Sequence, residues 1–175
     1  MIKLSKEKIR LRAVEMEDLD VIYQWENTEK YWLISNTIIP FSRYTIELFI
    51  QNAQKDIFET KQVRFMIETI KDKKTIGCID IFDFDPYNLK AGIGIMIDND
   101  SERKKGYASE ALDIIIDYTH NFLGLKQIYA SIIVDNKNSI YLFESKKFEL
   151  NGRKKQWQRT GAEEWKDILF YQLLF

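Results

Sequence analysis

The fold is decided by the stretch Ser101-Glu102-Arg103-Lys104-Lys105-Gly106-Tyr107-Ala108-Ser109-Glu110-Ala111, which links an expected strand to an expected helix. The apolar run at residues 93–97 predicts the strand, and apolar residues at helical spacing over 111–122 predict the helix. Gly106 and the small residues after it allow several backbone N–H groups to converge where the helix dipole is positive. Because Arg103, Lys104 and Lys105 add positive charge, this corner predicts a phosphate site.

Two common kinds of phosphate loop do not match this corner. A Walker loop requires Gly-x-x-x-x-Gly-Lys-Ser/Thr, and a dinucleotide fingerprint requires Gly-x-Gly-x-x-Gly at the start of a helix. Gly92 and Gly94 lie inside the expected strand, too early for the second pattern. The remaining pattern, Arg103-x-x-Gly106-x-Ala108, resembles the pyrophosphate-binding signature of the GNAT superfamily of acyl-CoA N-acyltransferases.

Two other stretches carry the same resemblance. Ile9-Arg10-Leu11-Arg12-Ala13, followed by Glu17-Asp18-Leu19, resembles the opening of the Rim-type branch of GNAT, which modifies protein amino termini. Further on, Asn136, Ser139, Glu144 and Phe148 match the GNAT element Asn-x-x-Ser-x-x-x-(Tyr/Leu)-Glu-Lys-x-Gly-Phe, although Lys147 replaces its glycine. With three stretches in order, the chain is identified as a member of the GNAT superfamily. It is also similar to spermidine acetyltransferases.

Composition limits the class of protein. The 175 residues suffice for one domain, residues 1–175, and 45% hydrophobic residues allow a buried core. A net charge of -1 argues against nucleic-acid binding. With one cysteine and one histidine, we expect neither a disulfide nor a metal site. No secretory signal or membrane-spanning run is present in the sequence, so we expect a cytoplasmic protein without a membrane partner.

The order of the expected elements describes one mixed α/β (α+β) domain. Alternation predicts strands at residues 8–13, 62–70, 75–82, 93–97, 127–134, 148–158 and 164–174. Helices are expected after Glu17-Asp18, from Ser42 to Ala53, after the basic corner and at residues 139–146. Residues 25–40 have no clean period, and residues 83–88 read as a turn. The resemblance implies a central mixed sheet with helices on both faces, splayed between its fourth and fifth strands.

Acetyl-CoA is the co-substrate that the resemblance implies. Its pantetheine arm would hydrogen-bond to the splayed strands, and its pyrophosphate would rest on the amides of residues 104–109. A backbone N–H near Met96 or Ile97 would stabilise the oxyanion. The residues expected to bind acetyl-CoA are Ile95, Met96, Ile97, Arg103, Lys104, Lys105, Gly106, Tyr107, Ala108, Ser109, Asn136 and Phe143.

The catalytic groups depart from the commonest GNAT pattern. Many relatives use a tyrosine as general acid where this chain has Phe143, which cannot donate a proton. Some relatives are thought to use the serine of the Asn-x-x-Ser element instead, and this maps onto Ser139. A glutamate common in the fourth strand is replaced by Gly92. The candidates for binding the acceptor are Glu26, Trp32, Asp83 and Asp85.

The acceptor remains open at this stage. Deprotonating an α-amino group (pKa near ~7.8) at pH 7 costs about 1 kcal/mol, whereas a lysine-like amine (pKa near ~10.4) costs about 4–5 kcal/mol. Without a carboxylate base, this favours a peptide amino terminus or an aminosugar. The leading hypothesis, which the resemblance to the Rim-type enzymes implies, is an acetyl-CoA-dependent N-acetyltransferase of protein amino termini. The alternatives are acetylation of small amines, including polyamines, and a CoA-binding module without catalysis.

The apolar end of the chain, residues 168–175, is expected to be either part of the core or a homodimer contact.

Overall fold

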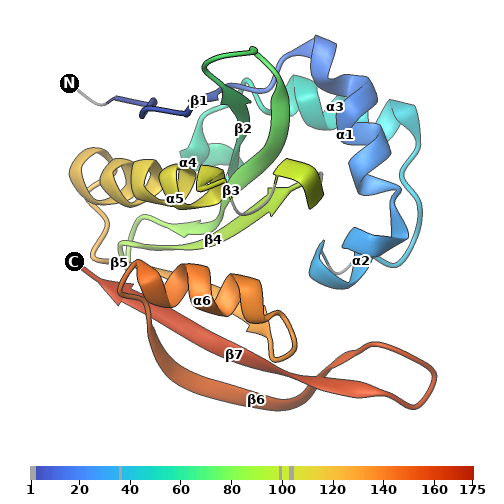
Figure 1. The fold of residues 1–175 in the computed structure, drawn as a ribbon, viewed down its shortest axis with the longest axis vertical. Coiled ribbons are helices and arrows are strands. Elements are labelled where there is room, and N and C mark those ends of the chain that lie inside the picture. The colour runs from blue at the N-terminus through green and yellow to red at the C-terminus, as the bar shows by residue number, and fades with distance from the viewer. Residues whose placement is uncertain (1–2, 36, 99, 103–104) are drawn as a thin grey trace.

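A computed structural model describes residues 3–35, 37–98, 100–102 and 105–175. These residues form a seven-stranded mixed sheet in the order β1-β2-β3-β4-β5-β7-β6, shown in Figure 1. The strands are β1 (Ile9–Arg12), β2 (Val63–Thr69), β3 (Thr75–Asp85), β4 (Lys90–Ile97), β5 (Gln127–Ile133), β6 (Glu149–Arg159) and β7 (Trp165–Leu174). The α-helices are α1 (Leu19–Glu26), α2 (Glu29–Ser35), α3 (Arg43–Asn52), α4 (Ile57–Thr60), α5 (Tyr107–Asp117) and α6 (Lys137–Ser145), with a π-helical turn at Tyr118–Phe122.

The fourth and fifth strands diverge, as predicted. They are parallel and pair at three positions, Lys90 with Gln127, Ala91 with Ile128 and Gly92 with Tyr129. Beyond this fork β4 stays paired with β3 up to Ile97, and β5 stays paired with β7 up to Ile133. The facing edges of β4 and β5 therefore have no ladder between them within the described residues.

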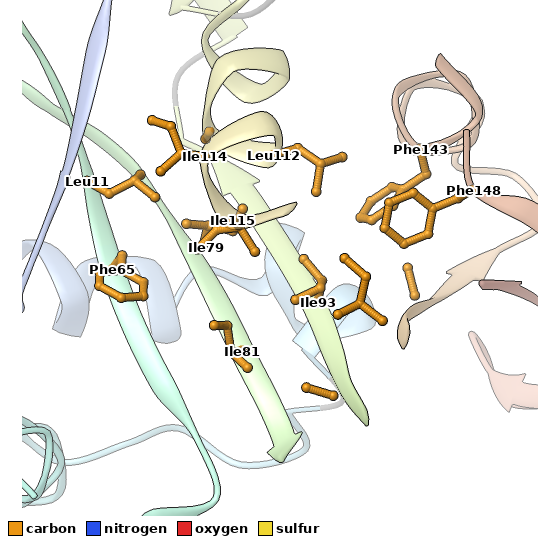
Figure 2. Packing of buried hydrophobic residues seen from close by; sticks show 14 of the residues in the cluster. Leu11, Phe65, Ile79, Ile81, Ile93, Leu112, Ile114, Ile115, Phe143 and Phe148 are labelled. Atoms are coloured by element: carbon orange, nitrogen blue, oxygen red, sulfur yellow. The ribbon is translucent and has the colours of Figure 1, made fainter. Parts of the chain in front are cut away.

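The main core lies between the sheet and the helices α5 and α6. In Figure 2, Ile114 and Ile115 of α5 lie beside apolar side chains of β1 and β3, and Leu112 extends toward Phe143 of α6. Burying each of these side chains contributes about 1.5–3 kcal/mol. Phe143 of α6 packs edge-to-face against Phe148, with ring centroids 4.9 Å apart. This packing fixes α5, and with it the corner from which α5 starts.

The opposite face of the sheet is covered by α1 and α3. Ile22 and Trp25 of α1, with Ile46 and Ile50 of α3, form a second apolar cluster against β2 and β3. Helices thus lie on both faces of the sheet, as predicted. Figure 1 shows α1, α2 and α3 grouped at one side of the sheet, away from the β6–β7 hairpin.

The guanidinium group of Arg12 attaches the start of α1 to the sheet. It donates to both carboxylate oxygens of Asp18, at 2.7 and 2.8 Å, and to Glu68 of β2 at 2.9 Å. Asp18 and Glu68 are both buried. Arg12 therefore links Asp18, which directly precedes α1, to Glu68 of β2. This fixes the first turn of α1 against the sheet.

Some expected boundaries were wrong. β3 continues through residues 83–85, so Asp83 and Asp85 lie at the end of a strand and not in the expected turn. Its register with β4 shifts after Phe82, where Asp83 has a φ of 49°, and this irregularity hides the strand in the sequence. β4 begins at Lys90, three residues before the expected start. The segment without a clean period contains α2, and α4 was not predicted.

No described helix is long and apolar enough to cross a lipid bilayer.

Candidate active site

The corner between β4 and α5 has the backbone geometry of an anion site. Gly106 has a φ of 86°, and the N–H of Glu110 closes the first helical turn by donating to the Gly106 carbonyl at 3.0 Å. The N–H groups that precede this bond have no partner one turn earlier in the helix. They belong to Tyr107, Ala108 and Ser109, all expected pyrophosphate contacts. Arg103 and Lys104 lie outside the described residues.

A lysine that the sequence did not reveal lies beside this corner. The ammonium of Lys8, just before β1, donates to the Lys105 carbonyl at 3.0 Å and lies 3.3 Å from the position of a Cβ at Gly106. Glu110 of α5 accepts from the N–H of Lys8 at 3.0 Å and holds it there. The ammonium of Lys105 instead pairs with Glu102 at 2.9 Å, which raises the pKa of Lys105. Lys8 therefore supplies positive charge at the corner.

A cleft of about 1280 Å³ opens where β4 and β5 separate. Among the described residues it is bordered by both strands, by α6 and by β6 and β7. It brings together the predicted catalytic serine, three of the four predicted acceptor residues and three of the predicted acetyl-CoA contacts. Those that line it are Trp32, Asp83, Asp85, Ile95, Asn136, Ser139 and Phe143. Ile97 is buried and is not among the residues that line this cleft.

Ser139 lies in the first turn of α6, at the cleft wall. Its N–H donates to the side chain of Asn136 at 3.2 Å, so Asn136 caps the helix. The Ser139 hydroxyl has no hydrogen bond to another described residue, which leaves it able to face a ligand. Phe143, four residues or about one helical turn further along α6, is buried and contributes only apolar surface to the cleft.

A second cavity, of about 460 Å³, lies between the helical cover and the faces of β2, β3 and β4. Its walls include five aromatic side chains, from Trp25, Tyr31, Phe41, Phe49 and Phe82. The charged residues lining it are Glu26, Arg64 and Asp80. Arg64 donates to the two oxygens of Asp80 at 2.7 and 2.8 Å, and to Glu26 at 2.7 Å.

The two spaces meet at the fork of the sheet. Thr37, Phe82, Gly94 and Ile95 line both of them. A molecule in the smaller cavity can therefore reach a molecule that lies along the cleft. Arg64 and Asp80 were not predicted as site residues. The available signal was a pair of opposite charges inside the mainly apolar stretches of two adjacent strands, at residues 63–67 and 76–82.

The expected acceptor residues differ in how they are held. Asp83 accepts a hydrogen bond from the Tyr129 hydroxyl at 3.0 Å; burial, followed by this bond, raises the pKa of Tyr129 to about 12. Asp85 accepts from the N–H groups of Tyr87 and Asn88, at 3.0 and 2.9 Å, and so shapes the β3–β4 turn. These hydrogen bonds give Asp85 a structural role in the turn. Glu26 does not line the cleft; it lies in the smaller cavity, where it accepts a hydrogen bond from Arg64.

Two further features of the cavities limit their chemistry. Burial raises the pKa of the Cys78 thiol to about 12, so Cys78 stays a neutral thiol at physiological pH. Among the described residues, no three side chains of His, Cys, Asp or Glu gather in a way that could hold a metal ion. The groups that can act are therefore a backbone anion site, a free hydroxyl and a pair of carboxylates.

Comparison with known proteins agrees with this geometry. Residues 8–149 match the model of the acetyltransferase (GNAT) domain. The chain belongs to the GNAT acetyltransferase family. It is an acetyl-CoA-dependent N-acetyltransferase, and acetyl-CoA is its co-substrate. Its separated strands and the free amides of α5 fit that co-substrate.

Among its relatives, the uncharacterized N-acetyltransferase p20 of Bacillus licheniformis is 31% identical over 99% of this chain and 97% of p20. The spermidine N(1)-acetyltransferase of Escherichia coli K12 is 24% identical over 85% of this chain and 76% of its own. The crystal structure of the spermidine N-acetyltransferase of Vibrio cholerae, in complex with CoA and spermine, shares the fold with a TM-score of 0.84. It is 22% identical and covers 95% of both chains.

Proposed function

We propose that residues 1–175 act as one domain that acetylates a small-molecule primary amine. The amine occupies the smaller cavity, and acetyl-CoA lies along the gap between β4 and β5. The observation that carries this proposal is the meeting of the two spaces at Phe82, Gly94 and Ile95. The names of two similar proteins, which act on spermidine, also favour a small amine over a protein amino terminus.

The co-substrate is held by the backbone in this proposal. The pyrophosphate rests on the N–H groups of Tyr107, Ala108 and Ser109, with the ammonium of Lys8 adding charge. Arg103 and Lys104 keep their predicted roles at the same corner. The pantetheine amides hydrogen-bond to the edge of β4 beyond Gly92, where the ladder to β5 has ended.

The transfer itself is a direct attack. The neutral amine nitrogen attacks the thioester carbonyl, a C–N bond forms, the C–S bond breaks, and the thiolate leaves and is protonated. The attacking nitrogen gives up a proton through water or a carboxylate of the smaller cavity. The hydroxyl of Ser139, free of other partners among the described residues, donates to the leaving sulfur and recovers its proton from water.

A protein amino terminus is the second candidate, because the larger cleft, with a volume of about 1280 Å³, also borders the fork. One experiment separates the two. Thiol release from acetyl-CoA is measured with small amines, aminosugars and peptides, and each product is identified by mass. We expect turnover with small amines. Turnover only with peptides would overturn the proposal, and stabilisation by CoA without any turnover would indicate a CoA-binding module.

The number of subunits stays a prediction. The apolar end of the chain was expected to be either core or a homodimer contact, and most of that segment forms β7 inside the sheet. A structurally similar spermidine N-acetyltransferase of Vibrio cholerae is dodecameric. Light scattering on the purified protein measures the mass in solution, and a dimer mass would support the prediction.

A further inference from the structure

The charge of the smaller cavity limits the acceptors it can hold. We propose that this cavity selects amines with a single positive charge, and that Arg64 is the residue that excludes polyamines. This inference rests on the proposed function, since it assigns the acceptor to the smaller cavity. It departs from what the names of the spermidine-acetylating relatives suggest.

Arg64 is held in one position by all its neighbours. Its guanidinium binds Asp80 with two parallel hydrogen bonds and Glu26 with a third. It also lies over the ring of Phe49, 5.1 Å from its centroid. Its side chain is only 16% exposed. An arginine with this many fixed contacts does not swing away to make room for a second cation.

The balance of charge then follows from the residues that line the cavity. Two carboxylates, Glu26 and Asp80, face one guanidinium, so the described lining carries one net negative charge. A single ammonium group neutralises this remaining negative charge. A second or third ammonium of a polyamine would lie near Arg64 without a carboxylate of its own, and in a partly desolvated cavity this is unfavourable.

Asp80 also lies at the right place to bind the reacting amine. It is paired with Gly94 across the β3–β4 ladder, so both face the same side of the sheet. Gly94 adds no side chain to the space above it, and it lines both the cavity and the cleft. An ammonium that binds the Asp80 carboxylate is therefore next to the thioester path.

The larger cleft offers no better site for a polycation. The charged residues that line it are Asp83, Asp85, Lys90, Lys154 and Arg159, so positive charges outnumber carboxylates among the described residues. Asp83 and Asp85 also already accept hydrogen bonds from Tyr129 and from Asn88. The aromatic wall of the smaller cavity in turn suits an apolar body. The acceptor class is thus a primary monoamine with an aliphatic or aromatic body.

The test compares amines of matched length. Initial rates are measured with hexylamine, phenethylamine, 1,6-diaminohexane and spermidine. For the wild-type enzyme we expect kcat/KM for each monoamine to exceed that for the diamine and for spermidine by about tenfold or more. If spermidine is the best substrate, the inference is overturned while the proposed function stands.

Variants show whether Arg64 is responsible. In Arg64→Gln the ratio of diamine to monoamine kcat/KM should rise by about tenfold, because two carboxylates are released. In Glu26→Gln the KM for monoamines should rise by a similar factor, with CoA binding unchanged. Arg43→Gln, which removes a guanidinium from the exposed Asp20 pair, is the matched control and should leave the ratio as it is. An unchanged ratio in Arg64→Gln, with stabilisation by CoA retained, overturns the role of Arg64.

Measuring the binding of amines without turnover separates the proposed function from the proposed selectivity of the smaller cavity. Isothermal titration of the same amines into the CoA-bound enzyme needs no turnover. Tighter binding of the monoamines supports the inference even if none of the four is acetylated, a result that would count against the proposed function alone. Equal or tighter binding of spermidine overturns the inference.

Discussion

The ring of Phe82 occupies the space that a side chain at Gly92 would need. The two residues are partners across the β3–β4 ladder, and a Cβ at position 92 would lie 2.3 Å from the ring. The ring also meets Tyr129 edge-to-face, with centroids 6.1 Å apart, at the last rung before β4 and β5 separate. A carboxylate at position 92 is therefore incompatible with this packing, and any protein base must come from another position in the chain.

The first prediction tests this contact. Gly92→Ala should lower the free energy of unfolding by about 1–3 kcal/mol, because the added methyl group displaces an aromatic ring. Urea denaturation measures the change. Gly94→Ala is the control on the same strand; its Cβ would meet Phe82 at 3.6 Å, an ordinary contact, so stability should change little. If Phe82→Leu does not recover part of the loss in Gly92→Ala, the cause lies elsewhere.

The second prediction concerns the anion site. Gly106→Ala should weaken CoA binding and also lower stability by about 1 kcal/mol, since alanine at a φ of 86° is strained. Gly124 has a φ of 64° and open space around it, so Gly124→Ala carries a similar strain away from the site. Calorimetric titration with CoA should show weaker binding for the first variant only. Equal affinities in both would place the pyrophosphate elsewhere.

The third prediction concerns proton delivery. Ser139→Ala should lower kcat by about 10²-fold, within the usual range for loss of a general acid, with little change in CoA affinity. The Asn136 cap uses the N–H of residue 139, which alanine retains, so the helix should stay intact. Steady-state kinetics and a thermal shift with CoA measure the two effects. A kcat equal to that of the wild type would remove Ser139 from the mechanism.

The fourth prediction follows from Asp18. Burial disfavours its charge, but the hydrogen bonds from Arg12 and from the Glu15 N–H lower the pKa of Asp18 below its ordinary value. A lowered pKa stabilises the folded state fully above the unfolded pKa of about 3.9, and that stability is lost as the pH falls through the folded pKa. We expect the melting temperature to fall below about pH 4, and to fall less steeply in Asp18→Asn.

At neutral pH the same variant isolates the ion pair. Asp18→Asn should cost about 3 kcal/mol, since the half-buried guanidinium of Arg12 loses the charge of its buried main partner. Asp20→Asn removes a carboxylate that is 80% exposed and should change stability little. Chemical denaturation at pH 7 compares the two. Similar losses in both variants would mean that Asp18 acts as an ordinary surface charge.

The anion corner could be predicted because its residues are local in the sequence, whereas the fork of the sheet was predicted only from the resemblance. Gly106 and the apolar spacing after it occupy about four turns of chain, and the resemblance to GNAT supplied the splayed strands. The position of Lys8 beside the anion site could not be inferred from local sequence. It comes to the corner only because α5 packs across β1, a contact between residues about a hundred positions apart.

The smaller cavity could not be predicted for a different reason. A regular hairpin joined by residues 71–74 would pair Arg64 with Ile81 and leave Asp80 on the opposite face of the sheet. In the structure the register shifts between Ile67 and Glu68, and Arg64 pairs with Asp80. One extra residue in β3 thus decides which face carries the carboxylate. Sequence alternation alone does not locate such a bulge.

The sheet consists of two blocks, one of four strands (β1 to β4) and one of three (β5, β7 and β6). Only three residue pairs, between β4 and β5, join the two blocks. A pantetheine arm between them would add the cross-links that the backbone lacks. The co-substrate would then act as a structural brace as well as an acetyl donor. Amide hydrogen exchange along the second halves of both strands should accordingly slow when CoA binds, so the enzyme would be most rigid when it is loaded for transfer.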